Sequence, residues 1–191
     1  NAQNTDNMLE LHVRLIPGGQ FTTRVFSAMK ERDILRIEGP LGSFSLRDKP
    51  EDGGDKPIVF LAGGTGFAPI KAIIDDMIAR EIQRPVSLYW GARTPEGLYL
   101  HDLAFRWARQ LSDFRYVPVI SGKPPEGWAG RSGLVHHAVM ADLPDLSGHQ
   151  VYACGAPEMI EAAKKDFSEA CRLPLTGFYA DAFTFATNNP I

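Results

Sequence analysis

A short apolar run followed at once by glycines is the feature that most constrains this chain. Residues 58–62 read Ile-Val-Phe-Leu-Ala and predict a strand buried on both faces. Residues 63–66, Gly-Gly-Thr-Gly, follow directly, and apolar residues then recur at the spacing of one buried helix face. These apolar residues are Ile70, Ile73, Ile74, Met77 and Ile78. Strand, glycine turn and helix together form half of a βαβ unit.

The glycine turn indicates a site for a phosphate group. A helix N-terminus has unpaired N–H groups and a partial positive charge, and glycines let a ligand approach the backbone. The turn departs from the usual dinucleotide fingerprint, because Pro69 stands where a glycine or alanine is expected. The acidic residue expected about 20 positions later is also absent. Nucleotide binding is the favoured interpretation, and tight strand–helix packing is the alternative.

Composition excludes several classes of protein. The chain has 191 residues, a net charge of −3 and 23% charged residues, so we expect no broad nucleic-acid surface. No apolar run is long enough for a membrane span, and residues 1–7 lack the apolar stretch of a secretory signal, so a cytoplasmic location is expected. Two cysteines, Cys154 and Cys171, are too few for an iron–sulfur cluster. The adjacent His136 and His137 are expected not to face one ion, and no metal site is predicted.

Residues 57–191 alternate between strand and helix patterns. Strands are predicted at 86–90, 116–120 and 151–154, and helices at 67–81, 100–111, 133–141 and from Pro157 onward. Residues 177–185 are interpreted as a final strand and a tail. This alternation predicts an α/β fold with a five- to six-stranded parallel, doubly wound nucleotide-binding sheet. Ligands bind such sheets at the carboxyl ends of the strands.

Residues 1–48 have a different pattern. Alternating apolar residues predict an antiparallel strand at 9–15, Thr22 or Thr23 is expected to cap a short helix, and strands are predicted at 34–37 and 44–46. So few strands cannot close a barrel, so we expect the last part of a larger antiparallel domain. Apolar residues such as Leu11, Val13 and Phe44 should then be exposed. The polar residues 49–56 are interpreted as a linker.

An ordered set of motifs resembles the ferredoxin–NADP reductase family of flavin and nicotinamide reductases. The motifs are GGTGFAP at 63–69, WGAR at 90–93, CGAPEM at 154–159 and DAFTF at 181–185, with PGGQFT at 17–22 and EGPLGSF at 38–44 before them. The closest resemblance is to reductase components of bacterial aromatic hydroxylases, such as phenol hydroxylase reductase, and to CDP-6-deoxyglucoseen reductases. The family's flavin-binding Arg-x-Tyr-Ser segment does not occur in the chain, so we expect it before residue 1.

The resemblance implies a set of residues that bind NAD(P)H. They are Gly63, Gly64, Thr65, Gly66, Phe67, Pro69, Gly91, Ala92, Arg93, Ser121, Cys154, Gly155, Pro157 and Met159. Residues 63–66 would hold the pyrophosphate, residues 91–93 would border the adenosine ribose, and Cys154 would position the nicotinamide C4 without acting as a nucleophile. The simpler alternatives are a solvated strand-end Arg93 and a Cys154 that is a small buried hydrophobe. Cys171 is expected in the core.

The resemblance also implies FAD contacts and an activity. Gly19, Phe21 and Thr22 would meet the flavin pyrophosphate, and Phe183 would lie against the flavin ring. The implied cofactors are NADH, with NADPH left open, FAD in the full-length protein and a 2Fe-2S centre on a further N-terminal domain. The implied function is hydride transfer from NADH to FAD, followed by electron transfer to a partner oxygenase or dehydrase. The alternatives are a reductase that releases free reduced flavin and a non-catalytic NAD-binding module.

Overall fold

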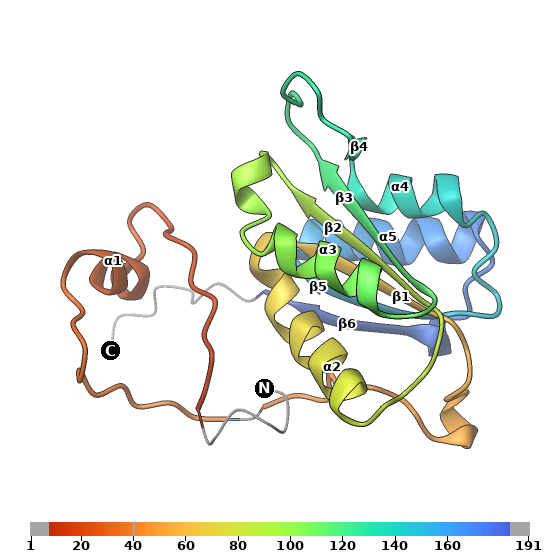
Figure 1. The fold of residues 1–191 in the computed structure, drawn as a ribbon, viewed down its shortest axis with the longest axis horizontal. Helices are drawn as coiled ribbons and strands as arrows, with labels where there is room; N and C mark the ends of the chain where they lie inside the picture. Colours follow the sequence, from red (N-terminus) through yellow and green to blue (C-terminus); the bar gives the residue numbers. More distant parts are fainter. Residues whose placement is uncertain (1–7, 40, 184–191) are drawn as a thin grey trace.

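The computed structural model describes residues 8–39 and 41–183. Residues 57–183 form an α/β unit, and the front segment, which we define as residues 8–48, forms an open loop beside it (Figure 1). The strands are β1 (Ile58–Gly63), β2 (Val86–Ala92), β3 (Phe114–Ile120), β4 (Arg131–Ser132), β5 (Gln150–Gly155) and β6 (Phe178–Ala182). The α-helices are α1 (Gln20–Ser27), α2 (Phe67–Ala79), α3 (His101–Gln110), α4 (Val135–Asp142) and α5 (Pro157–Ala170).

All neighbouring strands pair in parallel, and their order in the sheet is β4-β3-β2-β1-β5-β6. The predicted α/β class, with a parallel sheet, is therefore confirmed. The chain moves outward from β1 to β4 and then returns to the other side of β1 with β5. This reversal is a topological switch point, and it lies between β1 and β5. In open parallel sheets, ligands bind outside the carboxyl ends of the strands at such a point.

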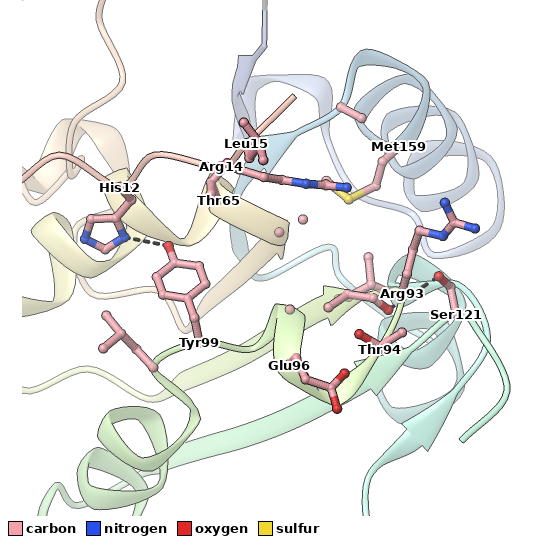
Figure 2. Close-up of a pocket in the computed structure, with 18 of the residues that line it drawn as sticks. His12, Arg14, Leu15, Thr65, Arg93, Thr94, Glu96, Tyr99, Ser121 and Met159 are labelled. Atoms are coloured by element: carbon pink, nitrogen blue, oxygen red, sulfur yellow. Dashed lines mark hydrogen bonds between the residues drawn. The ribbon is translucent and has the colours of Figure 1, made fainter. Parts of the chain in front are cut away.

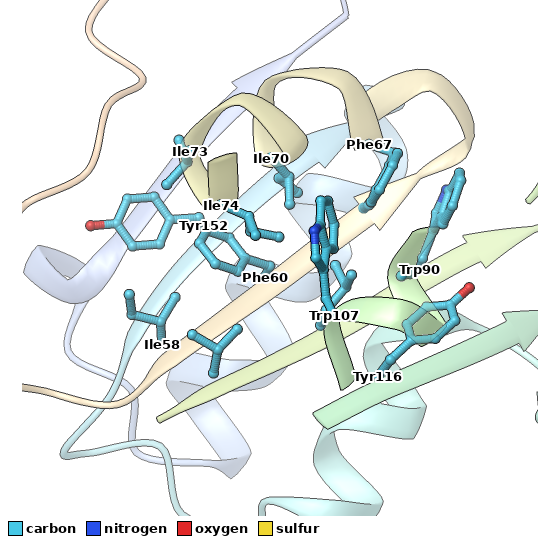
Figure 3. Packing of buried hydrophobic residues seen from close by; sticks show 14 of the residues in the cluster. Ile58, Phe60, Phe67, Ile70, Ile73, Ile74, Trp90, Trp107, Tyr116 and Tyr152 are labelled. Atoms are coloured by element: carbon cyan, nitrogen blue, oxygen red, sulfur yellow. The ribbon is translucent and has the colours of Figure 1, made fainter. Parts of the chain in front are cut away.

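Each face of the sheet has its own core. One core holds the even-numbered residues of β1 with Phe67, Ile70 and Ile74 of α2 and Trp107 of α3 (Figure 3). The other core holds Val59 and Leu61 of β1 with residues of α4 and α5. Side chains alternate in direction along a strand, so every residue of β1 from Ile58 to Ala62 is buried. The sheet is thus doubly wound, as the unbroken apolar run predicted.

The front segment contains α1 but not the strands that we expected. None of the described residues at 9–15, 34–37 and 44–46 is in a strand. A strand needs a hydrogen-bonded neighbour, and within residues 8–39 and 41–48 no two stretches pair. The alternating apolar pattern is therefore typical of a strand, but it did not correctly predict that a strand forms here. Leu11 is exposed as expected, and Ile34 is 96% exposed.

Two details of the front segment also differ from the sequence-based expectation. Phe44 is not free, because its ring packs edge-on against Tyr152 of β5 with the centroids 6.1 Å apart, and Val13 is half-buried. The helix begins at Gln20, after Gly19 as N-cap, whereas Thr22 or Thr23 was the expected cap. Thr22 instead lies inside the helix and its Oγ1 donates to the carbonyl of Ile16 at 3.3 Å. None of the residues of α1 is buried.

Residues 49–56, predicted as a linker, are held against the sheet. They include a 3-10 turn at Pro50–Asp52, and the buried Gln150 donates from Nε2 to the Asp52 carbonyl at 2.7 Å. Arg84, also buried, donates from Nε to the Lys56 carbonyl at 2.8 Å and from Nη2 to Gln150 Oε1 at 2.9 Å. The segment is therefore fixed by buried polar side chains at the amino ends of the strands. No helix in the described residues is both long and apolar enough to cross a bilayer.

Candidate functional site

A pocket of about 1160 Å³ opens at the carboxyl ends of β1, β2 and β3. Its walls include Gly63, Gly64 and Thr65 after β1, the residues from Gly91 to Thr94 after β2, and Ser121 after β3. Met159 of α5 and the front-segment residues from Glu10 to Leu15 complete it (Figure 2). Drug-sized ligand pockets measure about 300–1,000 Å³, so this pocket has room for a dinucleotide. The front segment and the α/β unit therefore share one pocket.

The turn after β1 is built to meet an anion. Gly64 has φ +54°, which is the left-handed region, and the nearest atom to a Cβ added there would be Arg14 Nη1 at 3.9 Å. Trp90 of β2 donates its indole N–H to the Gly64 carbonyl at 2.9 Å, so the turn is tied to the neighbouring strand. Figure 2 shows the Arg14 side chain crossing above Thr65 toward Met159. A cation beside glycines at a helix start is a suitable partner for a pyrophosphate.

The other glycines near β1 and β5 have packing reasons. A Cβ on Gly66 would lie 2.1 Å from the Cys154 carbonyl oxygen. A Cβ on Gly63 would lie 2.7 Å from Met159 Sδ, and one on Gly155 would lie 2.8 Å from Met159 Cε. Gly155 also has φ +154°. Within this one turn, access for a ligand therefore explains Gly64, and close packing explains Gly63 and Gly66.

The ends of β2 and β3 bring a second group of predicted residues together. Ser121 donates its backbone N–H to the Ala92 carbonyl at 2.9 Å, and Gly122 donates to the Arg93 carbonyl at 3.0 Å. Arg93 and Ser121 thus lie side by side at the pocket edge (Figure 2). A Cβ on Gly91 would lie 2.8 Å from Val135 Cβ, so the start of α4 packs directly on β2. The structure therefore brings Arg93 and Ser121 together, and their role at an adenosine ribose stays a prediction.

Six of the residues predicted to bind NAD(P)H do not line this pocket; they are Gly66, Phe67, Pro69, Cys154, Gly155 and Pro157. Phe67 is buried and stacks on Trp90 with ring centroids 3.8 Å apart. The two prolines lie in the first turns of α2 and α5. Cys154 is 1% exposed, and burial raises the pKa of its thiol to about 12. The thiol is therefore protonated at neutral pH, which argues against a nucleophilic role; the positioning role stays a prediction, and its burial also fits the alternative of a small buried hydrophobe.

The predicted flavin residues do not line the pocket either. Gly19 precedes α1, and Phe21 and Thr22 lie in its first turn, with Phe21 exposed. Phe183 packs partly buried against the core and donates its backbone N–H to the Gly155 carbonyl at 2.9 Å. The last two residues of the DAFTF motif, Thr184 and Phe185, lie outside the described residues. The tail therefore runs past the end of β5, directly beside Cys154 and Gly155.

Several pocket residues were missed by the sequence analysis. Arg14, Glu96 and Tyr99 all line the pocket. Tyr99 joins the two parts of the chain, because its hydroxyl lies 2.5 Å from His12 Nδ1 and its ring packs edge-on against Trp90. His12 Nε2 in turn lies 2.6 Å from a carboxylate oxygen of Glu10. No motif identifies these residues, because they reach the pocket from loops and from an unpaired segment.

Comparison with known proteins places these features in a family. The family described as "Oxidoreductase NAD-binding domain" matches residues 60–165, which is more than half of the chain. The chain belongs to this family. The family described as "Oxidoreductase FAD-binding domain" matches residues 1–46. The expected resemblance is thereby confirmed for both parts of the chain.

Named reductases are among the similar proteins, and this chain covers only part of their length. The chain is 45% identical over 183 residues to Protein RfbI of Salmonella typhimurium. It is 44% identical over 183 residues to the CDP-6-deoxy-L-threo-D-glycero-4-hexulose-3-dehydrase reductase of Yersinia pestis. Both matches cover 96% of this chain and 53% of the relative, so the chain spans about half the length of these relatives. The crystal structure of Amycolatopsis cytochrome P450 reductase GcoB matches with a TM-score of 0.87 and 36% identity, covering 98% of this chain and 55% of that one.

The pocket residues fit a nicotinamide dinucleotide. The open space over Gly64, the cations Arg14 and Arg93 and the hydroxyls of Thr65 and Ser121 suit a ligand with a pyrophosphate and a ribose. The described part of the flavin side offers less, namely the exposed start of α1 and the aromatic ring of Phe183. The described residues therefore form a pocket whose groups suit a dinucleotide, and they offer fewer groups to a flavin.

Proposed function

We propose that this chain is the nicotinamide half, with the end of the flavin half, of an electron-transfer reductase. The reductase would pass a hydride from NADH to FAD and then electrons to a partner protein. One observation supports this most directly: residues from the FAD-binding match and from the NAD-binding match line the same pocket. The names of the similar proteins, a dehydrase reductase and a cytochrome P450 reductase, support a protein partner as acceptor.

The domain limits follow the same proposal. Residues 1–48 would be the end of the flavin domain, residues 49–56 the connection, and residues 57–191 the NAD(P)-binding domain with its tail. The remainder of the flavin domain would lie outside these residues, in keeping with the two relatives, of which the chain covers 53%. Two free cysteines, Cys154 and Cys171, suit a reducing compartment such as the cytoplasm.

Each group of residues has one task in this proposal. Gly63, Gly64 and Thr65 would hold the pyrophosphate beneath Arg14, and residues 91–93 with Ser121 would border the adenosine ribose. Cys154 and Gly155 would set the position of the nicotinamide ring, and Phe183 would lie on the flavin side of it. NADH supplies the hydride and FAD the acceptor, so the protein's work is to bind, orient and exclude water.

The test is flavin reduction in the full-length gene product. Cys154→Ala should slow hydride transfer at least tenfold in stopped-flow measurements while the dissociation constant for NADH changes less than threefold, because a misplaced ring reacts slowly. Cys171→Ala, at an equally buried cysteine in the other core, is the matched control. No flavin reduction by NADH in the unmodified protein would overturn the proposed function. An unchanged rate in Cys154→Ala would remove only the role of this residue.

A further inference from the structure

Two histidines and an aspartate come together between α4 and α5. The proposed function assigns no role to any of the three. His136 and His137 are adjacent in the first turn of α4, and Asp166 lies on α5. Their potential ligand atoms all lie within 4.8 Å of one another. The sequence analysis expected adjacent helix residues not to face one ion. In the structure, Asp166 has a carboxylate oxygen near both imidazoles, whose ring centroids are 4.3 Å apart.

The distances between these side chains are also compatible with ligands of one metal ion. One oxygen of Asp166, Oδ2, lies 3.3 Å from His136 Nε2 and 3.9 Å from His137 Nε2. A charge-assisted hydrogen bond would be about 2.7–2.9 Å long. Two ligands bound tetrahedrally to one zinc ion at about 2.0–2.1 Å are about 3.3–3.4 Å apart. The His136–Asp166 spacing already matches this value, whereas His137 has to turn inward to reach it, since the three ligand atoms lie within 4.8 Å of one another.

The surroundings of the three residues also favour coordination. His136 is 3% exposed, and its Nδ1 has no hydrogen-bond partner in the described part of the chain. The side chains of His137 and Asp166 are 61% and 33% exposed, so an ion can enter from solvent and keep a water ligand. The exposed side chain of His137 can make the movement required.

We propose that His136 Nε2, His137 Nε2 and the Asp166 carboxylate bind a zinc ion at this surface, with water as the fourth ligand. Two imidazoles, one carboxylate and an open position form a common zinc ligand set. The ion would join the first turn of α4 to α5. Because His136 also lines the dinucleotide pocket, the zinc site and the pocket share one wall.

The test is titration of the untagged chain with ZnCl2 by isothermal calorimetry. We expect one zinc ion per chain with a micromolar or tighter dissociation constant. His137→Ala and Asp166→Asn should each weaken binding at least tenfold, because each removes an accessible ligand. His149→Ala, at a partly buried histidine before β5, is the matched control and should leave the affinity within twofold.

Two further measurements separate coordination from a structural effect. The melting temperatures of His137→Ala and Asp166→Asn without metal should equal that of the unmodified chain, since both side chains are partly or largely exposed. Co²⁺ should give the visible absorption of a four-coordinate site in the unmodified chain and in His149→Ala, but not in the two ligand variants. Absence of zinc binding, or zinc binding that both ligand variants retain, would overturn the proposal.

Discussion

At the scale of single residues, Gly64 and Gly66 occupy the same turn for different reasons. A Cβ at Gly66 would collide with the backbone of Cys154, whereas a Cβ at Gly64 would enter open space in the pocket. A glycine pattern in a sequence cannot distinguish these two requirements. The pattern correctly located the turn, but only the contacts between β1 and β5 show which glycine serves packing.

Substituting these two glycines should therefore affect different properties: mainly the stability of the fold at Gly66, and mainly the binding of NADH at Gly64. Gly66→Ala should destabilise the fold by more than about 2 kcal/mol, because the neighbouring backbone cannot move away cheaply. Gly64→Ala should cost only about 1–2 kcal/mol for its left-handed conformation, but should weaken NADH binding at least tenfold, since its methyl group lies where the pyrophosphate approaches. Thermal unfolding and NADH titration of both variants check this. Unchanged NADH affinity in Gly64→Ala would contradict the proposed phosphate position.

Glu96 offers a second prediction at this scale, which concerns the choice between NADH and NADPH. It lines the same pocket as Arg93 and Ser121, and its pKa is lowered by a hydrogen bond with Thr94, so the carboxylate is charged at neutral pH. A negative charge at the adenosine end disfavours the 2′-phosphate of NADPH. Glu96→Gln should tighten NADPH binding several-fold and change NADH binding less than twofold, as measured by calorimetry. Equal changes for the two dinucleotides would place Glu96 away from the 2′ position.

At the scale of secondary-structure elements, the buried polar residues at the amino ends of the strands hold residues 47–56 in place. Gln150 is central, because it accepts from Arg84 and from the hydroxyl of Tyr152, and it donates to the Asp52 carbonyl. Tyr152 in turn accepts the backbone N–H of Arg47 at 2.8 Å. A buried hydrogen-bond network loses more when one member is removed than its bonds contribute singly.

Gln150→Ala should therefore destabilise the α/β unit by about 2–3 kcal/mol, because it leaves several buried polar groups unpaired. It should also make the chain near residues 49–56 more sensitive to protease. Chemical denaturation and limited proteolysis measure the two effects. Gln110→Ala, at an exposed glutamine of α3, is the control and should change neither. Protease resistance equal to that of the unmodified chain would show that this segment is held by other contacts.

The sequence patterns correctly predicted the elements that form from local signals, that is, from the residues of the element itself. The apolar run of β1 and the helical spacing of α2 are local signals, and both elements formed close to the expected residues. The strand predicted at 9–15 did not form, because pairing depends on a neighbour that its alternation cannot specify. The two-residue strand β4 and the pocket residues Arg14 and Tyr99 were missed for a related reason. Their positions depend on contacts between distant segments.

At the scale of the whole molecule, the two proposed cofactor sites differ in how many binding groups the described residues supply. The dinucleotide pocket has walls from the strand ends, α5 and the front segment. The flavin side, within the described residues, has the exposed helix α1 and the ring of Phe183. A helix N-terminus and an aromatic stack contribute on the order of 1 kcal/mol each. A micromolar dissociation constant requires about 8 kcal/mol of net binding free energy.

A protein consisting of residues 1–191 should therefore bind NADH and lose FAD during purification. Its flavin contacts supply a small part of the required free energy, and they must also offset the lost translational and rotational freedom of the ligand. The purified chain should have no flavin absorbance near roughly 450 nm. NADH titration of the same sample provides the control, because binding there shows that the α/β unit is folded. A yellow preparation with one FAD per chain would mean that residues 1–48 form a far more complete flavin site than α1 and Phe183 provide.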